Sequence, residues 1–393
     1  MNNNWNDINR ALVIVPHQDD EVMLAGNTII KMRKLGIEVF VLFSTNGDWK
    51  YNAKTRIHEA KRSLKILGNI SDDHILLLGY GDNYNSSQHF HYYYSESGMV
   101  TCKSGHYETY GADEIDDFAY KHRHEHSTYN RKNFERDLKD AIIAIYPDLI
   151  ICIDFDEHPD HRILTLSFDK VMGELLRTQR SFRPVILKGF AYCNAYTAIP
   201  DLFSTELQNT VRPQIGITGK YQFDIIDSSI YEWDKRVQIY AGNESRSRNL
   251  LVNKKAKALA KHRSQYVILK ADRIINNDEV FWVRRTDSLS YAAEVSVTSG
   301  IASYLNDFRL YNVDITEDNY LTQELKFHMK KDSDEAFTLI SETKDKIQTT
   351  VGKVTHKTTD KVKVDEDGDY VSKSSQSDKI VLLISIKNIY VGK

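Results

Sequence analysis

The 393-residue sequence predicts an α/β protein, in which a mainly parallel sheet lies between layers of helices and a smaller all-β region follows. The first observation is that short apolar runs alternate with helical patterns, which is typical of parallel strands joined by right-handed crossovers. The second is a change near Val280 to short, alternating segments punctuated by turns, which favour antiparallel strands. We therefore expect a Rossmann-like layered α/β/α domain over residues 1–290 and a sandwich-like β domain over residues 291–393.

The α/β pattern begins with three apolar runs, which lie at residues 12–15, 37–43 and 74–82. Runs of this kind suit the buried strands of a parallel sheet. The helical patterns at residues 21–35 and 55–67 separate them, and each ends at a glycine, a common C-terminal helix signal. The order strand, helix, strand, helix, strand follows directly.

Residues 83–137 break this rhythm with many Tyr, His, Ser and Gly residues, and we expect an insertion or a lid there. A helical pattern at 133–146 is stopped by Pro147, and the apolar run DLIICIDF at 148–155 then predicts a fourth buried strand. The pattern further predicts a strand at 185–190 and helices at 229–240 and 250–261.

Composition and charge limit the classes of partner. With 41% hydrophobic and 27% charged residues, and no apolar stretch of ~20 residues, a soluble globular protein without a membrane span is expected. A net charge of −3 argues against nucleic acid. The three cysteines show no C-x-x-C spacing, so any metal must use His and carboxylate ligands. The N-terminus has no secretory pattern, so a cytoplasmic location is expected.

Ionisable residues follow two of the predicted strands at the point where each strand ends. The sequence HQDDE, residues 17–21, follows the first strand, and HPDHR, residues 158–162, follows the fourth. In open α/β sheets, ligands bind at the carboxyl ends of the strands. Both segments are therefore candidate parts of one site.

Three of these side chains can be taken together as metal ligands: His17, Asp20 and His161. A catalytic zinc commonly uses three His or carboxylate ligands and leaves one position open for water. Asp19 and His158 are the remaining groups, and they suit a base and an acid. Asp160, two residues after His158, can hold that imidazole in one tautomer.

The segments PHQDDE and HPDHR resemble the paired motifs of the LmbE-like, or PIG-L, de-N-acetylase family. TRIHEAKRSLKILG, LGYGD and LAKHRSQ are also similar to family segments, so the resemblance extends over residues 11–290. Gln18 stands where the family most often has proline. The resemblance implies a zinc enzyme that removes acetyl groups from N-acetylglucosaminyl compounds and related amides. It implies that His17, Asp20 and His161 are zinc ligands and that Asp19 is the general base. It further implies that His158 is the acid or oxyanion-stabilising group and that Asp160 tunes His158.

The same resemblance places Arg56 and Asp82 at substrate-contact positions. Each has an alternative interpretation. Arg56 with Glu59 can form an ordinary ion pair on a helix surface, and Asp82 after LGYG can be a turn residue.

Two classes of function remain open. The first is a zinc-dependent hydrolase acting on an N-acetylated sugar or glycoconjugate. The second is a carbohydrate-binding protein on a degenerate deacetylase scaffold. The presence of both Asp19 and His158 favours the enzyme, because a binding protein has no need of a base and an acid beside the metal.

Overall fold

The computed structural model describes residues 5, 7–83, 97–154, 158–179, 181–191, 207–210 and 233–284, and eight short strands beyond residue 295. The chain divides into two compact units. The first consists of residues Met1–Phe168, Pro184–Gln214 and Lys235–Arg284; the second consists of Asp169–Arg183, Ile215–Asp234 and Arg285–Lys393. The predicted division into 1–290 and 291–393 stays a prediction.

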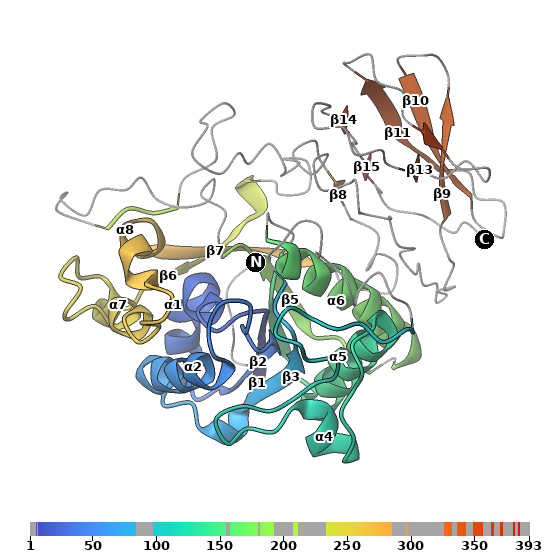
Figure 1. The fold of residues 1–393 in the computed structure, drawn as a ribbon. Helices are drawn as coiled ribbons and strands as arrows, with labels where there is room; N and C mark the ends of the chain where they lie inside the picture. Colours follow the sequence, from blue (N-terminus) through green and yellow to red (C-terminus); the bar gives the residue numbers. More distant parts are fainter. Residues whose placement is uncertain are drawn as a thin grey trace. The chain divides into compact units, whose positions relative to one another are not determined.

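The first unit contains a mixed sheet of seven strands in the order β3-β2-β1-β4-β5-β7-β6 (Figure 1). The strands are β1 (Arg10–Val15), β2 (Glu38–Thr45), β3 (Ile75–Tyr80), β4 (Leu149–Ile153), β5 (Val185–Gly189), β6 (Val237–Tyr240) and β7 (Asp278–Arg284). The pairs from β3 to β5 are parallel, whereas β7 runs antiparallel to both β5 and β6. The predicted α/β fold is confirmed for this unit.

The centre of the sheet is buried on both faces. Every residue of β4 and all of β1 beyond Arg10 are fully buried, as continuous apolar runs in a parallel sheet require. The chain leaves β1 toward β2 and β3 and then returns to place β4 on the other side of β1. This reversal is a topological switch point, the place where ligands bind in open α/β sheets.

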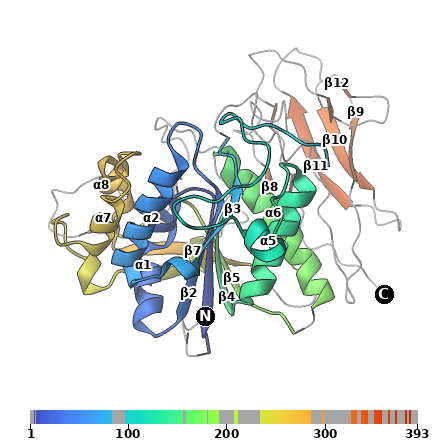
Figure 2. The same ribbon diagram turned by 60° about the horizontal axis from the view of Figure 1, so that its bottom comes forward.

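Helices cover both faces of the sheet, which gives the predicted three layers (Figure 2). One layer contains α1 (Asp20–Lys34), α2 (Ala53–Gly68), α7 (Lys254–Leu259) and α8 (Ala271–Ile274). The other contains α5 (Arg131–Ile145) and the first turns of α6 (Pro159–Thr178). Asparagine side chains cap α2 and α5: Asn52 accepts from the Thr55 N–H at 3.3 Å and Asn130 from the Asn133 N–H at 2.9 Å. None of the described helices is long and apolar enough to cross a membrane.

The described part of the 83–137 insertion packs against β3. Tyr129 is fully buried and donates its hydroxyl to the Gly79 carbonyl at 3.1 Å. Asp117, at the start of α4 (Phe118–Arg123), forms a parallel bridge with Leu77. These residues pack beside the sheet. The predicted lid function stays a prediction, and residues 84–96 of the insertion lie outside the described part.

The helix predicted at 229–240 is wrong over its described residues. Trp233–Lys235 is a short 3-10 turn, and Val237–Tyr240 is the edge strand β6. Pairing with β7 outweighs the weak helical pattern, because residues 237–240 can align with a neighbouring strand but are too few to form a helix with a buried face. The helix predicted at 250–261 exists only as the six residues of α7, capped by Asn253.

The strands described in the second unit pair antiparallel. They are β8 (Ser296–Val297), β9 (Lys326–Lys331), β10 (Ala336–Glu342), β11 (Thr349–His356), β12 (Lys363–Val364), β13 (Tyr370–Val371), β14 (Ile380–Val381) and β15 (Ile384–Ser385). Four of them form a sheet in the order β14-β11-β10-β9, and the others form two pairs. The sandwich arrangement stays a prediction.

Candidate active site

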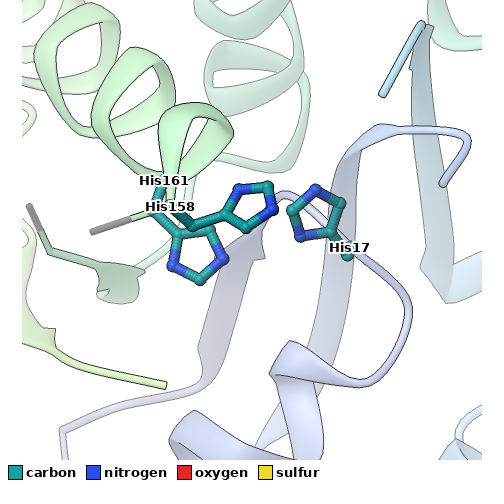
Figure 3. Close-up of side chains that lie close together, drawn as sticks. All are labelled: His17, His158 and His161. Atoms are coloured by element: carbon teal, nitrogen blue, oxygen red, sulfur yellow. The ribbon is translucent and has the colours of Figure 1, made fainter. Parts of the chain in front are cut away.

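The two motifs meet at the switch point. The loop after β1 carries the first motif into the start of α1, and the second motif begins α6 after β4. Figure 3 shows the rings of His17, His158 and His161 gathered together. The His17 ring centroid lies 4.5 Å from that of His158 and 5.5 Å from that of His161. His158 and His161 therefore share one site with His17, although they follow it by 141 and 144 positions in the sequence.

Asp20 joins the two histidines with which it was predicted to bind a metal. Its Oδ2 atom lies 3.0 Å from His17 Nδ1 and 3.2 Å from His161 Nε2. All three side chains are buried. Burial opposes ionisation of Asp20, but the His161 and His17 rings lower its pKa well below the ordinary value. The structure thus keeps this carboxylate charged between two imidazoles.

These residues fit a divalent transition metal. The second oxygen of Asp20, Oδ1, is buried and has no hydrogen-bond partner within the described part of the chain. An unsatisfied buried carboxylate oxygen is costly unless a cation or donor reaches it. Near these residues, one ring nitrogen each of His17, His158 and His161 lies within 4.8 Å of the other two, and so does one ligand atom each of His17, Asp82 and Asp160. Two imidazoles and one carboxylate match the donors of a catalytic zinc site.

Asp19, which directly precedes the predicted ligand Asp20, has a strained conformation. Its φ of 150° and ψ of −28° are rare for any residue other than glycine. Its N–H donates to Glu21 Oε2 at 2.8 Å, and its Oδ1 lies 3.3 Å from the Arg56 guanidinium. Burial raises the pKa of the Asp19 carboxyl to about 6, while the Arg56 charge acts in the opposite direction. The structure thus holds both the backbone and the carboxylate of Asp19.

Arg56 is buried within the site, so the surface ion pair with Glu59 is wrong. One guanidinium nitrogen, NH2, donates to the Gln18 carbonyl at 2.9 Å and to Gln265 Oε1 at 2.8 Å, besides its contact with Asp19. Its other nitrogen, NH1, lies 3.7 Å from Asp82 Oδ2. Arg56 therefore cross-links the loop after β1, and contact with a substrate stays a prediction.

Asp82 faces His17, one of the predicted metal ligands. Its Oδ1 atom lies 3.6 Å from His17 Nε2, and its N–H donates to Asp48 Oδ1 at 2.8 Å. Burial opposes ionisation, but His17 and then Arg56 hold the pKa of Asp82 below its ordinary value. Asp82 is part of the charged site, and its role toward a substrate stays a prediction.

Asp160 contacts the two motifs with different atoms. Its backbone N–H donates to His158 Nδ1 at 3.2 Å, while its carboxylate Oδ2 lies 3.0 Å from His17 Nε2 and accepts from the Asn83 N–H at 3.0 Å. Burial raises the pKa of Asp160 to about 7. The hydrogen bond to His158 comes from the backbone N–H of Asp160, so tuning of His158 by the Asp160 carboxylate stays a prediction.

Carboxylates also surround His17. Burial opposes its charged form, but Asp82, Asp160 and Asp20 together raise the pKa of His17 well above the ordinary value. Its two ring nitrogens face Asp20 on one side and Asp160 and Asp82 on the other.

Sequence reasoning missed four residues that contact the site: Glu21, Asn83, His262 and Gln265. Glu21 and the segment with His262 and Gln265 belong to stretches that resemble the family. Residue spacing could not predict the contacts of His262 with Glu21 and of Gln265 with Arg56, because these partners lie 241 and 209 positions apart.

Comparison with known proteins gives the following likenesses. Residues 12–171 match the family model described as "PIG-L: GlcNAc-PI de-N-acetylase". A diacetylchitobiose deacetylase of Thermococcus kodakarensis is 36% identical over 77 residues, which span 17% of this chain and 29% of that relative.

Solved structures of two deacetylases also match. An N,N'-diacetylchitobiose deacetylase from Pyrococcus horikoshii is 16% identical, with a TM-score of 0.38 over 72% of this chain and 87% of the other. A deacetylase of the teicoplanin biosynthesis pathway is 16% identical, with a TM-score of 0.39 over 71% of this chain and 99% of the other.

The family match begins in β1 and ends within α6, so it includes both motifs and every predicted site residue. The resemblance of the two motifs to the PIG-L (LmbE-like) family is therefore matched by a family model over residues 12–171.

Proposed function

We propose that this protein is a metal-dependent hydrolase that removes the N-acetyl group from an N-acetylglucosamine-type sugar or a related amide. One observation carries the proposal: His17, Asp20 and His161 lie together at the switch point with Asp19 and His158 beside them. The family model is described as a GlcNAc-PI de-N-acetylase, and the Thermococcus kodakarensis relative is named a diacetylchitobiose deacetylase. Both support an amino-sugar substrate.

His17, Asp20 and His161 would hold the metal. Zinc is the metal that this donor set favours, because two imidazoles and one carboxylate leave a coordination position open. When bound, it supplies a Lewis acid that polarises the amide carbonyl and lowers the pKa of water. The chain's own residues must then position and move the protons.

Asp19 would take the proton of the attacking water. Its carboxylate is buried next to the ligand Asp20, and Arg56 fixes one of its oxygens at 3.3 Å. In this proposal the other oxygen would face the water. A general base contributes when it is held within hydrogen-bond reach of the proton that it removes.

His158 would stabilise the developing oxyanion through its ring N–H, and the proton that Asp19 takes from water would pass on to the leaving amine. Its Nδ1 accepts the Asp160 N–H at 3.2 Å, so the neutral ring carries its proton on Nε2. An Nε2–H donor beside the metal ligands suits the negative oxygen of a tetrahedral intermediate. The amine that leaves would be the free amino group of the sugar.

The alternative is a carbohydrate-binding protein on an inactive scaffold. The strained backbone of Asp19 disfavours it, because such conformations cost on the order of 1–3 kcal/mol and cluster at active sites.

The test is acetate release across a panel of N-acetyl sugars, chitin oligosaccharides, N-acetylglucosaminyl lipids and sugar nucleotides. The full chain is used in three states: as purified, stripped with a chelator, and stripped and reloaded with zinc. The proposal expects acetate from at least one substrate, loss on stripping and recovery on reloading. Sugar binding without acetate release from any metal-loaded sample would support the alternative. A matched His74→Gln variant, which changes a histidine outside the site, controls for general effects of histidine replacement.

A further inference from the structure

A four-residue segment after α7, residues 262–265, contacts the loop that carries Asp19. The segment has the sequence HRSQ and lies outside residues 12–171. His262 is buried, Ser264 and Gln265 are half-buried, and Arg263 is exposed. Two separate chains of hydrogen bonds lead from this segment to Asp19.

The first chain ends on the backbone of Asp19. His262 Nε2 lies 3.1 Å from Glu21 Oε1, and the other oxygen of Glu21 accepts the Asp19 N–H at 2.8 Å. Neither the His262 nor the Glu21 side chain has any exposed surface. One carboxylate therefore spans from an imidazole to the N–H of a residue at φ 150°. A backbone in that region persists only where its surroundings hold it.

The second chain ends on the carboxylate of Asp19. Gln265 Oε1 accepts from Arg56 NH2 at 2.8 Å, and the same nitrogen lies 3.3 Å from Asp19 Oδ1. The NH2 nitrogen carries two hydrogens but has three acceptors, because the Gln18 carbonyl also accepts from it. The orientation of the guanidinium therefore depends on all three partners. Gln265 thus helps to set which way Arg56 presents itself to Asp19.

Glu59 of α2 anchors the segment. Its Oε1 accepts the Ser264 N–H at 2.9 Å, and its Oε2 accepts the Ser264 hydroxyl at 2.8 Å. Two bonds from one carboxylate to one residue fix the turn between His262 and Gln265. The side chains on either side of Ser264 are then directed toward Glu21 and Arg56.

We propose that His262, Ser264 and Gln265 form a positioning element for Asp19, which holds its backbone through Glu21 and its carboxylate through Arg56. The inference rests on the proposed function, because it assigns these residues to the placement of the general base. Their contacts with the site run through Glu21 and Arg56, so they are positioning residues and not catalytic residues.

The kinetic test compares His262→Leu, which removes the donor, with His262→Gln, whose Nε2 amide can still reach Glu21. Misplacement by about 1 Å can cost about 100-fold in rate, so His262→Leu and Gln265→Leu should each lower kcat by about 10- to 100-fold. KM and metal content should not change, and His262→Gln should recover most of kcat. Arg263→Gln, in the same turn but exposed, is the matched control and should match the parent.

A second measurement does not depend on activity. Hydrogen–deuterium exchange of the peptide that contains Asp19 should be faster in His262→Leu than in the parent, His262→Gln and Arg263→Gln. If the parent releases no acetate from any substrate, the proposed function fails while this exchange measurement still decides the positioning role. Unchanged exchange and unchanged kcat in folded His262→Leu would overturn the inference. If His262→Leu does not fold, Gln265→Leu decides it by the same two measurements.

Discussion

At the scale of single residues, Asp19 concentrates the unusual features of the site. It combines a backbone conformation at φ 150° with a buried carboxylate next to a predicted metal ligand. Both features oppose stability, since strain and burial of a charge each cost free energy. Hydrogen bonds from Arg56 and to Glu21 offset that cost. A group held in this way suits a chemical role better than a structural one.

Asp19→Asn should keep the metal and lose turnover. The amide keeps the size of the side chain and removes only its ability to take a proton, and loss of a general base costs on the order of 10²–10⁴ in rate. Acetate release and metal content are measured on the same preparation. Asp20→Asn is the comparison, because replacement of a predicted ligand should lower metal content as well. Near-normal turnover by fully metallated Asp19→Asn would remove Asp19 from the mechanism.

His262 should make the stability of the protein depend on pH. Burial opposes its charged form, but Glu21 at 3.1 Å, with Asp19 in support and Arg56 in opposition, raises the pKa of His262 above its ordinary value. A raised folded-state pKa gives stability that is fully present below the unfolded pKa of about 6.5 and is lost as the pH rises through the folded pKa. The advantage of the parent over His262→Gln should therefore be largest in acid.

Urea unfolding of metal-stripped parent and His262→Gln between about pH 5 and pH 9 measures this difference, because groups common to both proteins cancel. A gap in unfolding free energy that widened with rising pH would mean that His262 is neutral in the folded protein.

The sequence could predict residues of the site that lie within the two motifs, and it could not predict those that support them. His17, Asp20 and His161 follow from the ends of two buried strands, because parallel strands place their carboxyl ends at one edge. The pairing of Glu21 with His262 depends on where a turn 241 positions later packs. No local pattern encodes a contact of that separation.

At the scale of secondary-structure elements, α1 is interrupted where it leaves the site. Ala25 has φ −140° and ψ 19°, which breaks the helix and frees the N–H groups of the next turn. Glu279 of β7 accepts those of Asn27 and Thr28 at 2.8 and 2.9 Å. Lys255 of α7 lies 2.6 Å from Glu279, with both side chains almost fully buried. The Glu279 carboxylate thus accepts the hydrogen bonds that the helix lacks, and Lys255 balances its buried charge.

Lys255→Met should destabilise the protein by about 3–5 kcal/mol, because it leaves Glu279 charged and buried without its partner. The double variant Lys255→Met with Glu279→Gln should be more stable than Lys255→Met alone. Lys257→Met is the matched control, since Lys257 is exposed on the same short helix. Chemical denaturation followed by circular dichroism gives the three free energies. Equal losses from Lys255→Met and Lys257→Met would show that the pair contributes nothing to the fold.

Sequence patterns predicted strands that are buried along their whole length, and they failed to predict a strand that is only partly buried. The runs at β1 and β4 are apolar throughout and were predicted correctly. Strand β6 has only one fully buried residue, Ile239, so its period gave no strand signal and a helix was predicted wrongly. Only the pairing with β7 identifies it as a strand.

At the scale of the whole molecule, the site belongs to the first compact unit. Every predicted ligand, Asp19, His158 and the segment 262–265 lie within that unit, which ends at Arg284. The strand order reverses between β1 and β4, and the loops that follow these two strands supply the groups of the site. The predicted cut at residue 290 leaves this arrangement whole.

A shortened chain of residues 1–290 should keep the hydrolytic activity of the full chain. Catalytic groups at strand ends depend on the sheet that places them, and all seven strands of that sheet remain. Hydrolysis of a small N-acetyl sugar should stay within about tenfold of the full chain. Long or surface-bound substrates should suffer more, because a second module that also binds the substrate raises its effective concentration at the site.

Both forms are compared after circular dichroism and gel filtration have shown that each is folded and after metal content has been matched. The second unit also takes in Asp169–Arg183, which the shortened chain retains without the residues after 290. A lower unfolding midpoint with unchanged kcat on the small sugar is therefore compatible with two domains. A folded, metal-loaded 1–290 chain that cannot hydrolyse the small sugar would mean that residues after 290 complete the active site. The division at residue 290 would then be wrong, because the chemistry would need both parts of the chain.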